Sequence, residues 1–373
     1  MAVQIENLEV QQFRGIHRLS IPQLNHINII AGDNNCGKTS FLEALLLFRE
    51  PRDIVNVMRI ARQRDNITMF RAPSLFDSFL SLFPPAEGPE EPRWISLEAD
   101  CRGHRISFAL DGKIQTVMLD QEEQRRGPYS TVRNPRRSLP SECQGFVGER
   151  VCKINGSAST EPVLVHEYTS YNGLGVSSMR FLNMIYLSPF EHLRGSVFSR
   201  ILTNDFYKDL CLHILHLFDP QIADLLLVKS ETTGRPVECI RHERLGVMPL
   251  STYGDGIKKV LSIASGMAQA VDGVLLIDEV ETAIHSKYFE EIFRFILSAA
   301  VKFDVQVFIT THSIEAIDGF LAAQDYDRYP GPDDTLSIIT LKKDDRSARS
   351  YSRVLSGRHV WQNREQFDFE VRL

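Results

Sequence analysis

The sequence lacks paired cysteines, long apolar runs and a leader-like amino terminus. Its six cysteines are scattered and none stands in a C-x-x-C pair. This spacing gives no zinc site or disulfide framework and suits a reducing compartment. Apolar runs such as ALLLF are too short to span a bilayer, and MAVQIENLEV has neither the basic nor the apolar region of a signal peptide. We therefore expect a cytoplasmic protein with no membrane partner.

Internal repeats and sustained heptads are also missing, which argues against a long coiled-coil arm. The net charge of -6 and the pI near 6.0 argue against a generally basic nucleic-acid coat but leave a local basic groove open. The 373 residues, 43% hydrophobic and 24% charged, suit one large globular domain or two smaller ones.

A phosphate-binding loop is the strongest motif. Residues 31–40, AGDNNCGKTS, contain G-x-x-x-x-G-K-T between an apolar strand run, HINIIAG, and a helical run, TSFLEALLLF. The motif requires this strand–loop–helix context, in which backbone amides and the helix start face the β-phosphate. The residues predicted to bind nucleotide are Gly32, Asp33, Asn34, Asn35, Cys36, Gly37, Lys38, Thr39 and Ser40.

Side chains of this loop have separate expected tasks. Lys38 supplies positive charge to the β- and γ-phosphates, the Thr39 hydroxyl ligates Mg²⁺, and Ser40 reaches the α-phosphate. Cys36 has two interpretations, a redox-active thiol or a small residue that fills the loop, and we favour the second.

Two downstream strands end in polar residues. In GVLLIDEVETAIH, four apolar residues lead into Asp278, expected to hold Mg²⁺ through water, and Glu279, expected to orient or deprotonate the attacking water. A buried strand closed by ordinary surface acids is the alternative, which two adjacent acids downstream of a P-loop disfavour. In VFITTHS, His312 is a candidate γ-phosphate sensor.

The stretch PLSTYGDGIKKVLSIA lies just before the Asp-Glu strand and predicts a helix beginning near Ile257. Such a helix start is a second anion site. The P-loop helix already serves its own nucleotide, so we expect this second start to meet the γ-phosphate bound by another subunit. The candidate contacts are Ser251, Thr252, Gly254, Asp255 and Gly256, and the choice between Ser251 and Thr252 stays open.

The chain between the motifs suggests an interrupted fold. Two strands are predicted around a turn at Gly15, and a strand pair in TLSIITLKKD and ARSYSRVL. WISLEADCRGHRISFALDGKIQTVML predicts strands joined at DG. We expect an α/β ATPase lobe in residues 1–50 and 181–373, with a mixed central sheet, and a mixed α+β insertion at 51–180 that meets a substrate or partner.

The order of loop, signature helix, Asp-Glu pair and switch histidine resembles the ABC-type ATPase superfamily. FRG, GDNNCGKTS, STYGDGIKK and IDEVETAIH look like the OLD (overcoming lysogenisation defect) type, which is related to the RecF and SMC repair ATPases. The resemblance covers residues 1–50 and 180–315. The signature departs from the LSGGQ form, and Ser188 only marks the neighbourhood of a Q-loop.

The resemblance implies a homodimer or higher homo-oligomer built around ATP and Mg²⁺, each P-loop facing the partner's signature. OLD-type ATPases often act in bacterial defence against phage with a TOPRIM nuclease, fused or separate. A TOPRIM domain needs on the order of a hundred residues, more than follow His312. We therefore interpret Asp325 and Asp327 as a solvated acidic loop, and expect a separately encoded effector, a nuclease or a toxin.

Three functions remain: a regulator of such an effector, a RecF-like repair ATPase that clamps DNA, and a transporter subunit. The altered signature, the insertion, Glu281 and His285 disfavour the third. Basic candidates for DNA contact are Arg49, Arg52, Arg59, Arg62, Arg64, Arg71, Arg125, Arg126, Arg133, Arg136 and Arg137. Nearby Glu50, Asp53 and Asp65 leave a solvated or partner-facing helix equally open.

Overall fold

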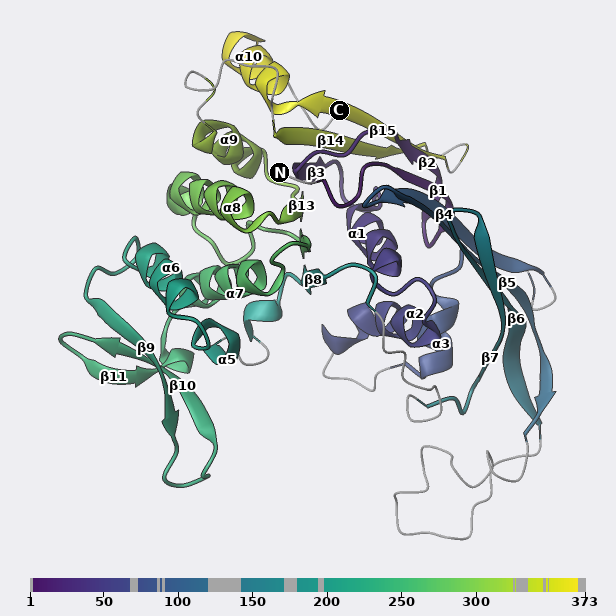
Figure 1. Cartoon of the computed structure of the whole chain (residues 1–373), viewed down its shortest axis with the longest axis horizontal. Coiled ribbons are helices and arrows are strands. Elements are labelled where there is room, and N and C mark those ends of the chain that lie inside the picture. Colours follow the sequence, from purple (N-terminus) through teal and green to yellow (C-terminus); the bar gives the residue numbers. More distant parts are fainter. Residues whose placement is uncertain are drawn as a thin grey trace.

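The computed structural model (Figure 1) describes residues 3–67, 73–85, 88, 91–119, 142–170, 180–193, 198–324, 326, 335–344, 347 and 349–367. These residues form two six-stranded sheets and one three-stranded sheet. In the described ranges, no helix combines the length and the apolar character needed to cross a bilayer.

The central sheet is mixed and carries the motif strands. Its order is β15 (Ser350–Ser356), β14 (Leu336–Lys343), β3 (Ile27–Ala31), β13 (Gln306–Thr310), β12 (Val274–Ile277) and β8 (Met184–Leu187). All pairs are parallel except β14 with β15, so the predicted C-terminal strand pair is confirmed. Parallel strands end at one edge, which brings the segments after β3, β12 and β13 together.

Helices cover both faces of this sheet. As a result, β3, β12 and β13 are buried along their whole length. Figure 1 shows α1 (Lys38–Leu46) on one face and α7 (Asp255–Gln269), α8 (Phe289–Phe303) and α9 (Ile314–Ala323) on the other. The α1 side chains pack with Ile30, Leu276 and Phe308 on one face of the sheet. The side chains of α7 to α9 pack with Ile29, Leu275 and Ile309 on the other face. The expected α/β head with a mixed central sheet is confirmed.

The second six-stranded sheet is antiparallel and curves beside α1, α2 (Ile54–Ala61) and α3 (Leu75–Leu80) in Figure 1. Its order is β2 (Ile16–Ile21), β1 (Leu8–Phe13), β4 (Arg93–Cys101), β5 (His104–Met118), β6 (Glu142–Ile154) and β7 (Ser157–His166). The predicted turn at Gly15 joins β1 and β2. Strands from residues 51–180 thus extend the sheet that β1 and β2 begin.

The turn predicted at Asp111–Gly112 is wrong. The β4–β5 turn is formed by Arg102 and Gly103, which both have positive φ, and Gly112 lies inside β5 opposite Gly148. A Cβ on Gly112 would lie 2.5 Å from the Val147 carbonyl oxygen, and one on Gly148 only 2.0 Å from that of Asp111. Glycine is required here by the close approach of two backbones and not by a turn.

A smaller antiparallel sheet precedes the signature region. It contains β9 (Ile222–Lys229), β10 (Pro236–His242) and β11 (Gly246–Pro249), and it packs against α5 (Phe198–Ile201) and α6 (Asp205–Leu215). The chain then passes through the short helix η5 (Leu250–Thr252) into α7, which begins at Asp255, close to the start predicted near Ile257. The last described helix is α10 (Gly357–Phe367).

Because β5 and β6 approach closely at Gly112 and Gly148, we expect a larger residue there to destabilise the fold. We expect Gly148→Ala to lower the free energy of unfolding by about 2 kcal/mol or more, because the strands must separate to admit the methyl group. Gly88→Ala is the matched control, since nothing lies within 4 Å of a Cβ there. Chemical denaturation of both variants measures the difference. Equal stabilities would contradict the assigned β5–β6 register.

Candidate nucleotide-binding site

The P-loop connects β3 to α1 and is confined on two sides. Gly32 and Gly37 have φ of 140° and 105°. A Cβ on Gly32 would lie 2.3 Å from the Leu341 carbonyl oxygen of β14, and one on Gly37 would lie 3.2 Å from Ile16 at the start of β2. Both glycines are therefore dictated by backbone conformation and by the neighbours of the loop.

Lys38 spans the loop from the first turn of α1. Its Nζ donates to the carbonyl oxygens of Gly32 and Asp33, each at 2.8 Å, which holds the ammonium at the loop. The Cys36 side chain is buried, and burial raises the pKa of its thiol. That environment fits a residue that fills the loop. Asp33, Asn34 and Asn35 are exposed at the loop surface.

The Asp278 carboxylate accepts hydrogen bonds from hydroxyl groups on three other elements. One carboxylate oxygen accepts from Thr39 Oγ1 at 3.3 Å and Thr310 Oγ1 at 2.5 Å, and the other from the Tyr186 hydroxyl at 3.0 Å. Burial, with the charge of Asp278, raises the Tyr186 pKa well above its usual value, so the phenol remains a donor. The Thr39 and Asp278 oxygens are ligands of the kind Mg²⁺ prefers.

Glu279 follows immediately but has different surroundings. Its φ is 47°, and its backbone N–H donates to Thr310 Oγ1 at 2.8 Å. A left-handed conformation costs a non-glycine residue on the order of 1 kcal/mol, and here it turns the chain away from the strand. The side chain is half-buried and accepts from Thr282 Oγ1 at 3.4 Å. The adjacent acids are thus one buried carboxylate and one within reach of solvent.

His312 lies after β13 and contacts an acid that sequence reasoning did not assign to the site. Its backbone N–H donates to Glu281 Oε1 at 2.9 Å, and its ring Nδ1 lies 3.0 Å from the same oxygen. The histidine side chain is 54% exposed and that of Glu281 only 10%. The Glu281 carboxylate therefore holds a histidine whose side chain is more than half exposed.

The predicted signature residues lie around the start of α7. Ser251, Thr252 and Asp255 are exposed, and Gly254 is the N-cap. Thr252 Oγ1 donates to the Pro249 carbonyl at 2.7 Å. Because α7 and α1 cover opposite faces of the sheet (Figure 1), the two helix starts approach the shared edge from different sides.

Arg64 is a site residue that the sequence analysis had grouped with a basic stretch. It donates to Ser40 Oγ at 3.0 Å and to both carboxylate oxygens of Glu43, at 2.8 and 2.6 Å. Glu43 is fully buried on α1 and also pairs with Arg14 at 2.8 Å. A glutamate inside the otherwise apolar run FLEALLLF was the available sign of a buried partner.

Other basic candidates are partly neutralised. Arg49 and Arg59 pair with Glu50, and Arg62 pairs with Asp65. Arg71, Arg125, Arg126, Arg133, Arg136, Arg137, Asp325 and Asp327 lie outside the described residues. Ser188 is buried and donates to Glu191 Oε2 at 3.1 Å.

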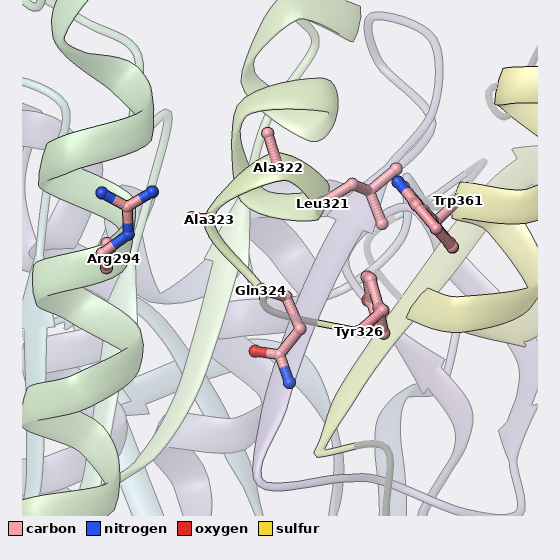
Figure 2. Close-up of a pocket in the computed structure, with 7 residues that line it drawn as sticks. All are labelled: Arg294, Leu321, Ala322, Ala323, Gln324, Tyr326 and Trp361. Atoms are coloured by element: carbon pink, nitrogen blue, oxygen red, sulfur yellow. The ribbon is translucent and has the colours of Figure 1, made fainter. Parts of the chain in front are cut away.

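A cavity of about 440 Å³ lies between α8, α9 and α10, away from these motifs (Figure 2). Tyr326 and Trp361 stack on one side, with ring centroids 5.5 Å apart, and Arg294 stands across from them. The lining contains none of the residues predicted to bind nucleotide.

Comparison with known sequences finds ATPase domains in both parts of the chain. Residues 4–76 match the family described as AAA ATPase domain, and residues 169–318 match that described as AAA domain, putative AbiEii toxin, Type IV TA system. A Helicobacter pylori protein described as an ATP/GTP phosphatase is 24% identical over 375 residues, covering 91% of this chain and 93% of that protein. An uncharacterized Methanocaldococcus jannaschii protein is 49% identical over 49 residues, 13% of this chain and 22% of that protein.

The fold also resembles a solved structure. The Smc head bound to the C-terminal winged-helix domain of ScpA superposes with a TM-score of 0.50 and 14% identity, covering 96% of this chain and 100% of that one. This likeness concerns the fold alone. The two family matches support a P-loop ATPase domain, and the fold resembles that of the Smc head.

Proposed function

We propose that this chain hydrolyses ATP with Mg²⁺ as a homodimer or a higher assembly of dimers, and that it regulates a separately encoded effector in defence against phage. The observation that carries the ATPase activity is the buried Asp278 carboxylate beside Thr39, with the half-buried Glu279 next to it in the chain. This pairing separates metal binding from proton transfer.

Each residue has a chemical task in this proposal. Lys38 neutralises the phosphates, and Arg64 supports Ser40. Thr39 and Asp278 would hold Mg²⁺, which would offset charge on the transferred phosphoryl group. A water oxygen bonds to the γ-phosphorus while the bond to the β–γ bridging oxygen breaks and ADP leaves. Glu279 accepts the proton that the water releases.

The dimer is proposed because one chain supplies only part of the site. The starts of α1 and α7 lie on opposite sides of the sheet, so the phosphate-facing residues of α7 suit a nucleotide held by another copy. Exposure of Ser251, Thr252 and Gly254 supports this assignment.

The effector is the more distant part of the proposal. The OLD-like motifs favour a TOPRIM-like nuclease, and the toxin named in one matched family description favours a toxin instead. The Smc head binds a separate protein domain, so a related fold can carry a partner. The pairing of Arg49 and Arg59 with Glu50, and of Arg64 with Glu43, weighs against a RecF-like DNA groove there.

Nucleotide chemistry is tested by two substitutions. Glu279→Gln should bind ATP normally but hydrolyse it on the order of 100-fold more slowly, since it removes the proton acceptor and leaves the phosphate loop intact. Lys38→Ala should lose ATP affinity. Equilibrium binding and phosphate release measure both effects. Wild-type turnover in Glu279→Gln would overturn the assignment of the base.

Assembly is tested by complementation. ATP should convert Glu279→Gln into a stable dimer or larger assembly, because nucleotide bound across two chains stabilises their association. Gly254→Asp should bind ATP without hydrolysing it. A mixture of Lys38→Ala and Gly254→Asp should regain part of the activity through one intact composite site. Light scattering and turnover of the mixture provide the measurement, and a fully active monomer would exclude this arrangement.

The biological role is tested in cells that carry the gene with its chromosomal neighbours. Wild type should lower phage plating efficiency, Lys38→Ala should abolish that protection, and Lys229→Ala, at an exposed position on β9, should retain it. Sensitivity to DNA damage in a deletion strain, without an effect on phage, would instead favour the repair ATPase.

A further inference from the structure

Thr310, the last residue of β13, lies beside the two acids that follow β12. The two strands are parallel with Ile277 opposite Ile309, so the next residues, Asp278 and Thr310, are neighbours. The Thr310 side chain is buried, and its hydroxyl makes two hydrogen bonds. It donates to Asp278 Oδ1 at 2.5 Å and accepts from the Glu279 N–H at 2.8 Å. One hydroxyl therefore contacts both residues of the Asp-Glu pair.

The backbone of Thr310 adds a third contact to the same segment. Its carbonyl oxygen accepts from the Val280 N–H at 3.2 Å, so one threonine holds three consecutive residues, from Asp278 to Val280. The middle residue, Glu279, has a φ of 47°. This left-handed conformation is unfavourable for a residue with a side chain and persists only where neighbouring groups stabilise it. Thr310 therefore supports the turn from which the Glu279 side chain extends.

The contacts of Thr310 require a hydroxyl group. A threonine hydroxyl has one proton and two lone pairs, and here the proton meets Asp278 while a lone pair meets the Glu279 N–H. Valine has the same branched shape but can form neither bond. The other carboxylate oxygen of Asp278 is held by the Tyr186 hydroxyl at 3.0 Å. Among the described residues, the Tyr186 hydroxyl bonds to Asp278 and not to Glu279.

We propose that Thr310 is a positioning residue that fixes the metal ligand Asp278 and the proton acceptor Glu279 relative to each other, so that both act on the same phosphate. This inference rests on the proposed ATPase activity. Tyr186 positions the Asp278 carboxylate alone. The two hydroxyls thus have different tasks: that of Tyr186 serves metal binding, and that of Thr310 joins metal binding to proton transfer.

Hydrogen–deuterium exchange of the nucleotide-free protein tests these contacts without catalysis. Thr310→Val leaves the Glu279 N–H without its acceptor, so we expect exchange within residues 278–282 to be on the order of tenfold faster. Thr310→Ser keeps the hydroxyl and should match wild type. Thr311→Val is the matched control, because it removes a buried hydroxyl that contacts Ser313 and neither acid, and exchange should stay unchanged. Unaltered exchange in Thr310→Val overturns the proposal.

Magnesium binding gives the second test. It is measured by calorimetry as the Kd for ATP in a Glu279→Gln background, in which turnover is slow. In EDTA, Thr310→Val and Tyr186→Phe should bind ATP as the parent does, because the P-loop is intact. In Mg²⁺, each should bind ATP about tenfold more weakly than the parent, since each lacks a donor that holds Asp278. An unchanged Kd for Thr310→Val in Mg²⁺ would contradict the role of Thr310.

Turnover at saturating Mg²⁺ separates the two hydroxyls. Thr310→Val should lower kcat on the order of tenfold or more, because Glu279 is displaced as well, and added Mg²⁺ should not restore it. Tyr186→Phe should lower kcat less, since a high Mg²⁺ concentration offsets its weaker metal binding. Thr310→Ser should recover most of the activity. Equal losses in Thr310→Val and Tyr186→Phe would show that Thr310 acts through Asp278 alone and would overturn the proposal.

ATP binding in EDTA shows whether each variant folds. If Thr310→Val fails that check, Thr310→Ala replaces it in all three measurements with the same expected results. A wild type that does not hydrolyse ATP would refute the proposed function, and with it any part of Thr310 in catalysis. Normal wild-type turnover with unchanged exchange and kcat in the Thr310 variant refutes only the role of Thr310.

Discussion

The Asp278 carboxylate is the interaction on which the rest of the site depends. It is 2% exposed and accepts from hydroxyls on α1, β8 and β13, while Asp278 itself directly follows β12. A buried carboxylate is costly unless its oxygens are paired, so these elements can pack closely only in the arrangement that satisfies it. The hydrogen bonds that position the Asp278 carboxylate for chemistry therefore also fix how these elements pack at the sheet edge.

The parts of the site that follow from local patterns could be predicted from the sequence. The strand before the P-loop, the Asp-Glu strand and the strand before His312 are mainly apolar runs followed by polar residues, and such runs indicate parallel strands buried on both faces. Because parallel strands end at one edge, the sheet brings the residues that follow these strands together. The turn at Gly15 followed from two alternating strands around one glycine.

Other features depended on partners far away in the sequence. Gly112 was predicted to be a turn residue, because the sequence alone does not distinguish a glycine required for close backbone approach from one required for positive φ. Arg64 was grouped with a basic stretch, and Glu281 was not assigned to the site, because a charged residue lies inside a protein only where a particular partner neutralises it. Their partners, Glu43 and His312, are brought to them by the packing of distant elements, which local sequence spacing does not reveal.

The pairing of β3 has a consequence for synthesis of the chain. Ile29 of the P-loop strand pairs with Ile309 on one side and Ile338 on the other, whereas the whole antiparallel sheet is complete once β7 ends at His166. A ribosome adds about 5–20 residues per second. The nascent protein therefore holds a finished outer sheet for on the order of ten seconds or more while β3 has neither neighbour. During that time both edges of β3 are unpaired, and unpaired strand edges are liable to pair wrongly.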